Sequence, residues 1–306
     1  MTPQIKAHIG LLATNLFFAI NISAIKYFTG QSLAGPYGLN VVRSGVCVIL
    51  FWLLFFITNE KKKIKKKDIV RFLLCAFSAL AANQMLFMKG VSLTYPIHAS
   101  LLLLITPILI TFIAAWVLKE TITPLKLIGL FLGVTGACIL IMSGHNATKR
   151  NDILLGDLLV IMSTVLYTIY FILVKPLMQK YSTMDVMRWV FTFGFIMILP
   201  LGWKEFVQIP WSLYKLDEYL LLFMIVVPGT FLAYIFNAYG IKKLSASTAG
   251  TYIYSQPVFA VIISTIFLKE SLDFYKIIAG IIIFSGVYLA NKTPPKSSLK
   301  RGLSKA

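Results

Sequence analysis

The chain has 306 residues, of which 58% are apolar and only 13% are charged, far from the balance of a soluble domain. Its net charge of +18 is also typical of nucleic-acid-binding proteins. The lysines and arginines, however, flank apolar stretches, where they serve as membrane anchors and topology signals. Composition therefore argues against soluble domains and a nucleic-acid partner, and it predicts an all-α integral membrane protein.

Apolar stretches of about 20 residues, the length that crosses the hydrocarbon core of a bilayer, follow one another along the chain. Cap-forming residues mark several ends; Thr123-Pro124, for example, is typical of a helix N-terminus. We predict ten transmembrane helices, over residues 8–28, 37–57, 69–91, 97–118, 124–143, 155–176, 184–203, 217–241, 247–268 and 273–291.

The basic residues predict the orientation of these helices, because cytoplasmic loops carry an excess of lysine and arginine. If both termini are cytoplasmic, most of the basic residues lie in loops on that side, including the run Lys61–Lys67. We expect a multi-pass protein of a bacterial inner membrane with both termini inside. We also expect Lys61–Lys67 to contact anionic lipid headgroups.

Features of the first half of the chain recur in the second half at a constant offset of 150 residues. Pro107 recurs as Pro257, and the sequence Leu-Lys-Glu occurs at 118–120 and again at 268–270. Internal repeats in a membrane chain are typical of secondary transporters. Each half would hold five helices, an odd number, so the second half would enter the membrane from the opposite side.

The repeat therefore predicts two inverted five-helix units related by a pseudo-two-fold axis in the membrane plane. Exchanging their slightly different conformations would convert an inward-open state into an outward-open one, which is alternating access. We expect the first unit at residues 1–150, the second at 151–292, and a basic cytoplasmic tail at 293–306.

Several of these segments resemble the EamA-type half of the drug/metabolite transporter superfamily. The matching segments are Gly90–Thr94, Ala99–Pro107, Leu118-Lys119-Glu120, Ser255-Gln256-Pro257 and Leu268-Lys269-Glu270. Asn21–Lys26 resembles the opening Asn-(apolar)-Lys pattern of the family, Arg43 stands where its second span carries an arginine, and Phe18-Ala19 departs from its common Trp-Gly. The resemblance covers residues 8–291 and implies ten helices around a central cavity for small metabolites.

Polar side chains within the spans are candidate substrate contacts, because an unpaired amide or charge is costly in hydrocarbon. The alternatives are bonds between helices for the amides, a place in the interfacial belt for the tyrosines, and a lysine that extends to the interface. A cavity lined by aromatic rings favours an amphipathic or cationic cargo. The candidates are Asn21, Lys26, Asn83, Gln84, Tyr167, Tyr170, Tyr234, Asn237, Tyr252 and Gln256.

Three further residues are candidates for gating or hinge motion. Arg43 lies about six residues into the second span without an acidic neighbour in sequence, so it either pairs with backbone carbonyls or gates the external mouth. Pro107 and Pro257 interrupt the helical hydrogen-bond ladder at equivalent positions, which is the pattern expected of hinges.

Other charged groups in or beside the spans have structural explanations. Arg188 follows Asp185 by three residues, so the two form an ion pair on one helical face. Glu120 is favoured by the positive end of the helix that follows it, with proton coupling as the alternative. Lys175 is expected to extend to the membrane interface.

The chain has no HExxH, GxSxG or Gly-rich phosphate loop, so we expect neither an enzyme nor a cofactor. We expect a secondary transporter that exports an amino acid or related metabolite by alternating access, driven by the substrate or proton gradient. The alternatives are a lipid or amphipathic-compound flippase and a passive channel on the same scaffold.

Overall fold

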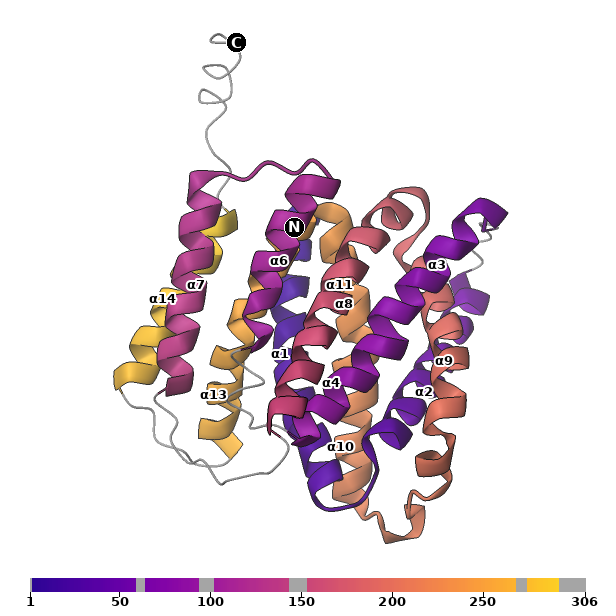
Figure 1. The fold of residues 1–306 in the computed structure, drawn as a ribbon. Coiled ribbons are helices and arrows are strands. Elements are labelled where there is room, and N and C mark those ends of the chain that lie inside the picture. The colour runs from indigo at the N-terminus through magenta and orange to yellow at the C-terminus, as the bar shows by residue number, and fades with distance from the viewer. Residues whose placement is uncertain (1, 59–63, 94–101, 143–152, 268–273, 292–306) are drawn as a thin grey trace.

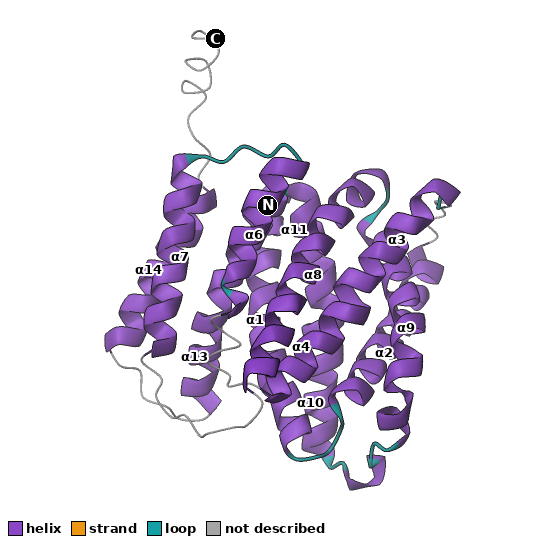
Figure 2. Cartoon of the chain, viewed as in Figure 1, coloured by secondary structure: helices purple, strands orange, loops and turns teal. Residues whose placement is uncertain are grey.

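The computed structural model describes residues 2–58, 64–93, 102–142, 153–267 and 274–291, and within these ranges every regular element is a helix (Figures 1 and 2). Helices occupy the described part of every predicted span. The continuous helices include α1 (Pro3–Gly30), α2 (Pro36–Thr58), α6 (Ile105–Val117), α7 (Pro124–Met142), α8 (Ile153–Lys180), α9 (Thr183–Val207) and α14 (Phe274–Asn291).

Side-chain caps set several of these helix starts. The Thr123 hydroxyl accepts a hydrogen bond from the backbone N–H of Lys126 at 3.2 Å, which confirms the predicted N-cap of α7. The Ser182 hydroxyl accepts from the N–H of Asp185 at 3.1 Å in the same way and begins α9. Both caps satisfy donors that would otherwise lack a partner at a helix end.

Other spans contain a change of helix type. The third consists of α3 (Ile69–Ala76), the π-helical turn η2 (Phe77–Ala81) and α4 (Ala82–Leu93). The eighth consists of α10 (Leu216–Val226), the π-helical turn η4 (Val227–Leu232) and α11 (Ala233–Lys243), and the ninth of α12 (Ala246–Thr251), the 3-10 turn η5 (Tyr252–Tyr254) and α13 (Ser255–Phe267). Short 3-10 turns, η1 (Lys66–Asp68) and η3 (Trp211–Leu213), precede α3 and α10.

The two π-helical turns begin 150 residues apart, at Phe77 and Val227. In η4, Pro228 has no N–H to donate, and its ring is too close to the carbonyl four residues earlier for regular α-helical geometry. Both effects explain why the hydrogen bonding of this turn departs from that of an α-helix. Such turns leave backbone carbonyls available to other partners and are frequent at functional sites.

Among the described residues, six helical segments are long and apolar enough to cross a membrane: Pro3–Gly30, Pro36–Ile57, Lys66–Leu93, Leu154–Lys180, Thr183–Val207 and Leu216–Lys243. Shorter apolar helices occupy Ile105–Val117, Pro124–Gly136 and Ile277–Asn291. Large apolar side chains such as Trp116, Phe131 and Leu154 are exposed on their outer faces. Such outer faces suit a lipid environment.

Helices of the first half pack mainly against helices of the second half. α2 contacts α9 and α7 contacts α14, while α4 packs on α8 and α1 on α11. Figure 1 shows α7 and α14 at one side of the bundle, α2 and α9 at the other, and α1, α8 and α11 between them. Gly90 and Gly240, matched by the repeat, permit close approach, because a Cβ there would lie 2.8 Å from Val160 and 2.5 Å from Leu11 respectively.

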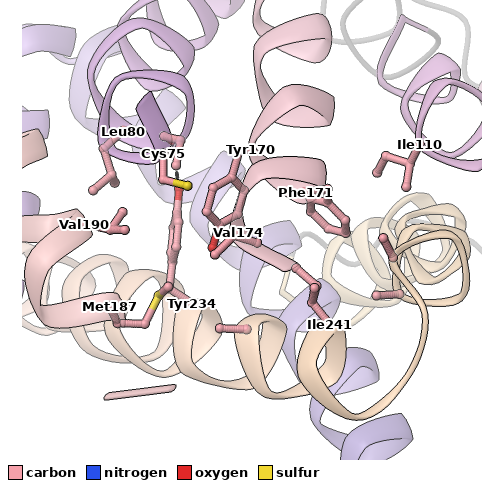
Figure 3. Packing of buried hydrophobic residues seen from close by; sticks show 14 of the residues in the cluster. Cys75, Leu80, Ile110, Tyr170, Phe171, Val174, Met187, Val190, Tyr234 and Ile241 are labelled. Carbon is pink, nitrogen blue, oxygen red and sulfur yellow. Dashed lines mark hydrogen bonds between the residues drawn. The ribbon is translucent and has the colours of Figure 1, made fainter. Parts of the chain in front are cut away.

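The core lies where α3, α8, α9 and α11 meet. Figure 3 shows part of this cluster, including Tyr170 and Phe171 of α8 and Tyr234 of α11, all of them essentially inaccessible to solvent. Leu80 of η2 and Val190 of α9 complete the contacts on the other side. Two of these helices, α8 and α11, also line the cavity described below, so the core positions part of its polar wall.

The structure confirms one predicted ion pair and corrects two other predictions. Arg188 Nη2 donates to Asp185 Oδ1 at 2.8 Å. The carboxylate of Glu120 accepts hydrogen bonds from the backbone N–H groups at the start of α12, at 2.7 and 3.1 Å, so it stabilises α12 and not the helix that follows it in sequence. Lys175 is bonded to the protein, and not free to extend along a lipid-facing surface, because its ammonium donates to the carbonyls of Ile241 and Leu244 at the end of α11.

A polar cluster joins the start of the third span to the connection between α8 and α9. Asp68 accepts hydrogen bonds from Lys180 Nζ and from the Tyr181 hydroxyl, both at 2.9 Å. Burial raises the pKa of Tyr181 above its usual range, and the neighbouring Asp68 raises it further. The Tyr181 hydroxyl therefore remains a proton donor to Asp68 at neutral pH.

Candidate functional site

A cavity of about 90 Å³ lies between the central helices, with space for several water molecules. Its walls come from α1, α2, α4, α8 and α11, from the first turns of α6 and α13, and from the residues just before these two turns. Many of the predicted site residues line it, namely Asn21, Arg43, Asn83, Gln84, Tyr167, Tyr234 and Gln256. Polar side chains from both halves of the chain therefore meet in one concave site.

Arg43 of α2 is 3% exposed and lies in the wall of this cavity. Its Nε donates to the Thr230 hydroxyl at 3.1 Å and its Nη2 to Gln84 Oε1 at 3.3 Å, while Nη1 lies 3.8 Å from Met88 Sδ. Within the described residues, no acidic side chain lines the cavity or pairs with Arg43. The site thus presents a positive charge whose protein partners are all neutral.

Gln84 connects Arg43 to the second half of the chain. Its Nε2 donates to the Tyr234 hydroxyl and to Asn83 Oδ1, both at 3.1 Å. The Tyr234 hydroxyl in turn donates to the carbonyl of Ala79, in the π-helical turn η2, at 3.3 Å. Asn83 Nδ2 donates to the carbonyl of Ser163 on α8 at 2.7 Å. The result is a continuous polar wall across α2, α4, α8 and α11.

Two other cavity amides contact different elements. Asn21 Nδ2 donates to the carbonyl of Gly229, in η4, at 2.7 Å, and Asn21 Oδ1 is buried without a partner in the described chain. Gln256 Nε2 donates to Asn15 Oδ1 at 2.8 Å and so ties α13 to α1. The π-helical turns therefore supply carbonyl acceptors at Ala79 and Gly229, which are 150 residues apart.

The structure places other predicted contacts outside the cavity wall. Tyr170 is fully buried in the core, Asn237 Nδ2 donates to the Tyr167 hydroxyl at 2.6 Å, and the Tyr252 hydroxyl lies 2.5 Å from His8 Nδ1. Asn237 therefore contacts the cavity wall through the hydroxyl of Tyr167, whose position it helps to fix. The side chain of Lys26 lies outside the described part of the structure, as do residues 61–63, 268–270 and 293–306.

Pro107 and Pro257 occupy equivalent places at breaks between helical segments. Each is the third residue of its helix, α6 or α13, and each helix follows a break, at Leu104 and at η5. They therefore stand within the first helical turn, where a missing N–H breaks no ladder hydrogen bond. Their role as hinges stays a prediction.

Sequence reasoning missed the small hydroxyl residues of the site. Thr106, Ser163 and Thr164 line the cavity, and Thr230 orients Arg43. Threonine and serine are common in apolar helices, where they bond to the preceding turn, as Thr164 does to the carbonyl of Val160 at 3.0 Å. The repeat held a usable signal, because Thr106 and the predicted Gln256 are 150 residues apart.

Comparison with known proteins agrees with this architecture. Relatives include the uncharacterized transporter YetK of Bacillus subtilis, 27% identical over 79% of this chain and 74% of its own length, and an uncharacterized transporter of Archaeoglobus fulgidus, 26% identical over 93% and 96%. A probable terminal-alkyne amino-acid exporter of Streptantibioticus cattleyicolor is 23% identical over 76% of each chain. A solved crystal structure shares the fold, with a TM-score of 0.73 at 16% identity over 94% of this chain and 99% of the other.

The model of the EamA-like transporter family matches the chain twice, at residues 5–142 and 154–292. Together the two matches cover nearly all of the described helices. The chain therefore belongs to the EamA-like transporter family of the drug/metabolite transporter superfamily and is a multi-pass, all-helical membrane protein.

Proposed function

We propose that this protein is a secondary transporter that exports an amino acid or a related small metabolite by alternating access through the central cavity. The observation that carries the proposal is the hydrogen bond between Gln84 and Tyr234 in the cavity wall. These residues are 150 apart, so equivalent positions of the two halves meet at the site. A cavity divided between two units changes its accessible side when one unit rocks against the other.

Several observations support two inverted five-helix units at residues 1–150 and 151–292. The family model matches the two halves separately. Helix contacts between the halves occur in symmetric pairs. The repeat makes α8 the equivalent of α1 and α11 the equivalent of α4; α1 packs on α11, and α8 packs on α4. α2 and α9, and likewise α7 and α14, are equivalent helices that pack on each other, as expected beside a pseudo-two-fold axis. If this pseudo-two-fold axis lies in the membrane plane, each unit of five helices crosses the membrane five times, and the whole chain crosses it ten times.

The cargo and its direction are part of the proposal. One relative is named as a probable amino-acid exporter, which supports an amino acid or a chemically related compound and outward movement. Either the cargo gradient or a proton gradient would drive the transport. We place both termini in the cytoplasm of a bacterial cell, with the exposed Lys65, Lys66 and Lys67 near anionic headgroups of the inner leaflet.

Counterflow in proteoliposomes tests this function. Vesicles containing the purified protein are preloaded with a mixed metabolite pool, diluted into labelled amino acids, and analysed by mass spectrometry. Saturable exchange above that of empty vesicles supports a carrier. Non-saturable flux in both directions would instead indicate a channel, and movement of fluorescent phospholipids between leaflets without metabolite exchange would indicate a flippase. Correct folding is checked by a monodisperse elution profile.

A further inference from the structure

We infer that Arg43 and Asn21 form the head-group subsite of the cavity, in which Arg43 binds the carboxylate of an α-amino acid and Asn21 accepts a hydrogen bond from its ammonium group. This inference rests on the proposed function, because it specifies the chemical class of the cargo. It is carried by the charge in the cavity, by the unused hydrogen-bonding groups of both side chains, and by their attachment to one turn of η4.

The charge of Arg43 lacks a counter-charge within the described chain. The carboxylates of the described residues lie near helix ends. Three of them have partners other than Arg43, since Asp185 bonds to Arg188, Asp68 to Lys180, and Glu120 to the start of α12. A buried guanidinium whose partners are only an amide, a hydroxyl and a thioether is expensive in a low-dielectric interior. A carboxylate brought by the cargo would complete the pair.

The guanidinium also has donors to spare. Of its five N–H groups, one on Nε, one on Nη1 and one on Nη2 face Thr230, Met88 and Gln84. The bond toward the thioether is weak, because sulfur is a poor acceptor. One N–H on each Nη atom is therefore free of a described partner, and an Nη pair matches the two oxygens of a carboxylate.

Asn21 supplies the complementary acceptor. Its Nδ2 is fixed by the carbonyl of Gly229, which only accepts hydrogen bonds, so Oδ1 is the atom left without a partner. The side chain is 5% exposed and lines the cavity. A Cβ at position 229 would lie 3.0 Å from Asn21 Cγ, a tight contact that would push the amide away by a few tenths of an ångström, so glycine favours this approach. A buried acceptor at a cavity wall suits a donor group of the cargo.

The two side chains are held by consecutive residues, since Asn21 bonds to Gly229 and Arg43 to Thr230. Neighbouring Cα atoms are about 3.8 Å apart, so consecutive residues of η4 anchor the donor and the acceptor at adjacent places in the cavity wall. An α-amino acid likewise carries its carboxylate and its ammonium group on one carbon. The arrangement thus fits an α-amino acid better than a simple amine or a long dicarboxylate.

The remaining residues of the cavity wall indicate the chemistry of the cargo's side chain. The other walls are mainly aliphatic and aromatic, formed by Phe18, Ile22, Ile25, Phe87, Leu103 and Ile253. Among the described residues, no acidic group lines these walls to balance a cationic side chain. The subsite therefore favours α-amino acids with neutral, apolar side chains over lysine or arginine as cargo.

Ligand-induced thermal stabilisation of the purified protein in detergent tests the subsite without requiring transport. The probes are L-alanine, L-leucine and L-phenylalanine, the amines without the carboxylate (ethylamine, isopentylamine and phenethylamine), 4-methylpentanoate, and L-lysine. We expect at least one neutral amino acid to raise the melting temperature, 4-methylpentanoate to act more weakly than leucine, and the amines and lysine to have little effect. Equal stabilisation by an amine, or no response to any neutral amino acid, would overturn the inference.

Variants of Arg43 and Asn21 test whether these side chains bind the ligand. Arg43→Gln should weaken amino-acid binding at least tenfold, and Arg43→Lys should weaken it less, because lysine keeps the charge but loses the paired donors. Asn21→Leu should reduce the preference for leucine over 4-methylpentanoate. Arg188→Gln is the matched control, since Arg188 is the other buried arginine of the described chain, lies on the equivalent helix and is paired with Asp185 outside the cavity wall. It should keep the ligand response even if its melting temperature falls.

The outcomes separate this inference from the proposed function. Carboxylate-dependent binding that Arg43→Gln abolishes, without counterflow in vesicles, would support the subsite and contradict the transporter. Counterflow that is indifferent to the carboxylate and unchanged in Arg43→Gln would support the transporter and contradict the subsite. If Arg43→Gln does not fold, Arg43→Lys and the leucine preference of Asn21→Leu decide the matter.

Discussion

Replacing glycine by alanine should change the stability of the protein in opposite directions at Gly129 of α7 and at Gly280 of α14. A Cβ at Gly129 would lie 2.5 Å from the carbonyl oxygen of Gly286 and 2.5 Å from the backbone nitrogen of Ala290. Both are backbone atoms of α14, so no side chain can rotate away and the helices must separate. At Gly280, also on α14, the nearest atom to an added Cβ is Val258 Cγ1 at 3.7 Å, an ordinary van der Waals contact.

These distances set the expected magnitudes. Replacing glycine by alanine within a helix stabilises it by about 0.5–1 kcal/mol when the space is open. Overpacking a tight contact costs about 1–3 kcal/mol. We therefore expect Gly280→Ala to raise the free energy of unfolding by up to about 1 kcal/mol. For Gly129→Ala, which combines both effects, we expect a net loss of about 1–2 kcal/mol.

Thermal unfolding in detergent, followed by intrinsic tryptophan fluorescence, measures both variants against the parent chain. The two proteins differ from it by the same methyl group, so detergent and side-chain effects are matched. Melting temperatures in the order Gly280→Ala, parent, Gly129→Ala are expected. A Gly129→Ala protein as stable as Gly280→Ala would refute the close approach of α7 and α14 at this glycine.

Other predictions follow from single contacts. Glu120→Ala removes the carboxylate that caps α12 and should lower the free energy of unfolding by about 1–2 kcal/mol in the same assay, whereas Glu120→Gln should lose less. Thr123→Ala removes the N-cap of α7 and should cost about 1 kcal/mol, while Thr135→Ala, whose hydroxyl bonds only within its own helix, should be neutral. Tyr234→Phe removes the hydroxyl that bonds to Gln84 and to the carbonyl of Ala79, and should slow amino-acid counterflow several-fold with a small change in melting temperature. Unchanged counterflow would contradict a role for these bonds.

The sequence predicts the helices well because hydrophobic length and cap residues are local signals. The predicted start of α7 at Thr123-Pro124 agrees with the structure, and so does the pairing of Arg188 with Asp185, three residues apart. These features depend on neighbours within one turn of helix. The π-helical turns η2 and η4 lack such a local signal apart from Pro228, and sequence analysis did not foresee them.

Contacts between distant segments explain the failures. Glu120 caps α12, more than 120 residues away in sequence, and Lys175 binds the last carbonyls of α11. In both cases the nearest helix end in sequence, or the nearest interface, is a reasonable partner, but the folded chain brings a better one. Tyr170 shows the same limit, because the sequence does not distinguish a tyrosine that faces a cavity from one that is buried in the core, as Tyr170 is.

The two halves share their packing residues but differ in their cavity residues. The glycines at 90 and 240, the glycines at 136 and 286, and the prolines at 107 and 257 are identical at equivalent positions. In the cavity wall, by contrast, Asn21 corresponds to Phe171, Arg43 to Phe193, Asn83 to Ala233 and Gln84 to Tyr234.

This division follows from what each set of residues must do. In the proposed mechanism, packing residues must let both halves adopt the same two conformations, so that exchanging them leaves the energy nearly unchanged. The proposed cargo has no two-fold symmetry, because it carries a charged head group at one end and an apolar part at the other. A symmetric pair of arginines would place a second buried charge against the apolar part of the cargo. A charge in one half without a charged counterpart in the other is therefore the arrangement that a repeated scaffold needs for an asymmetric ligand.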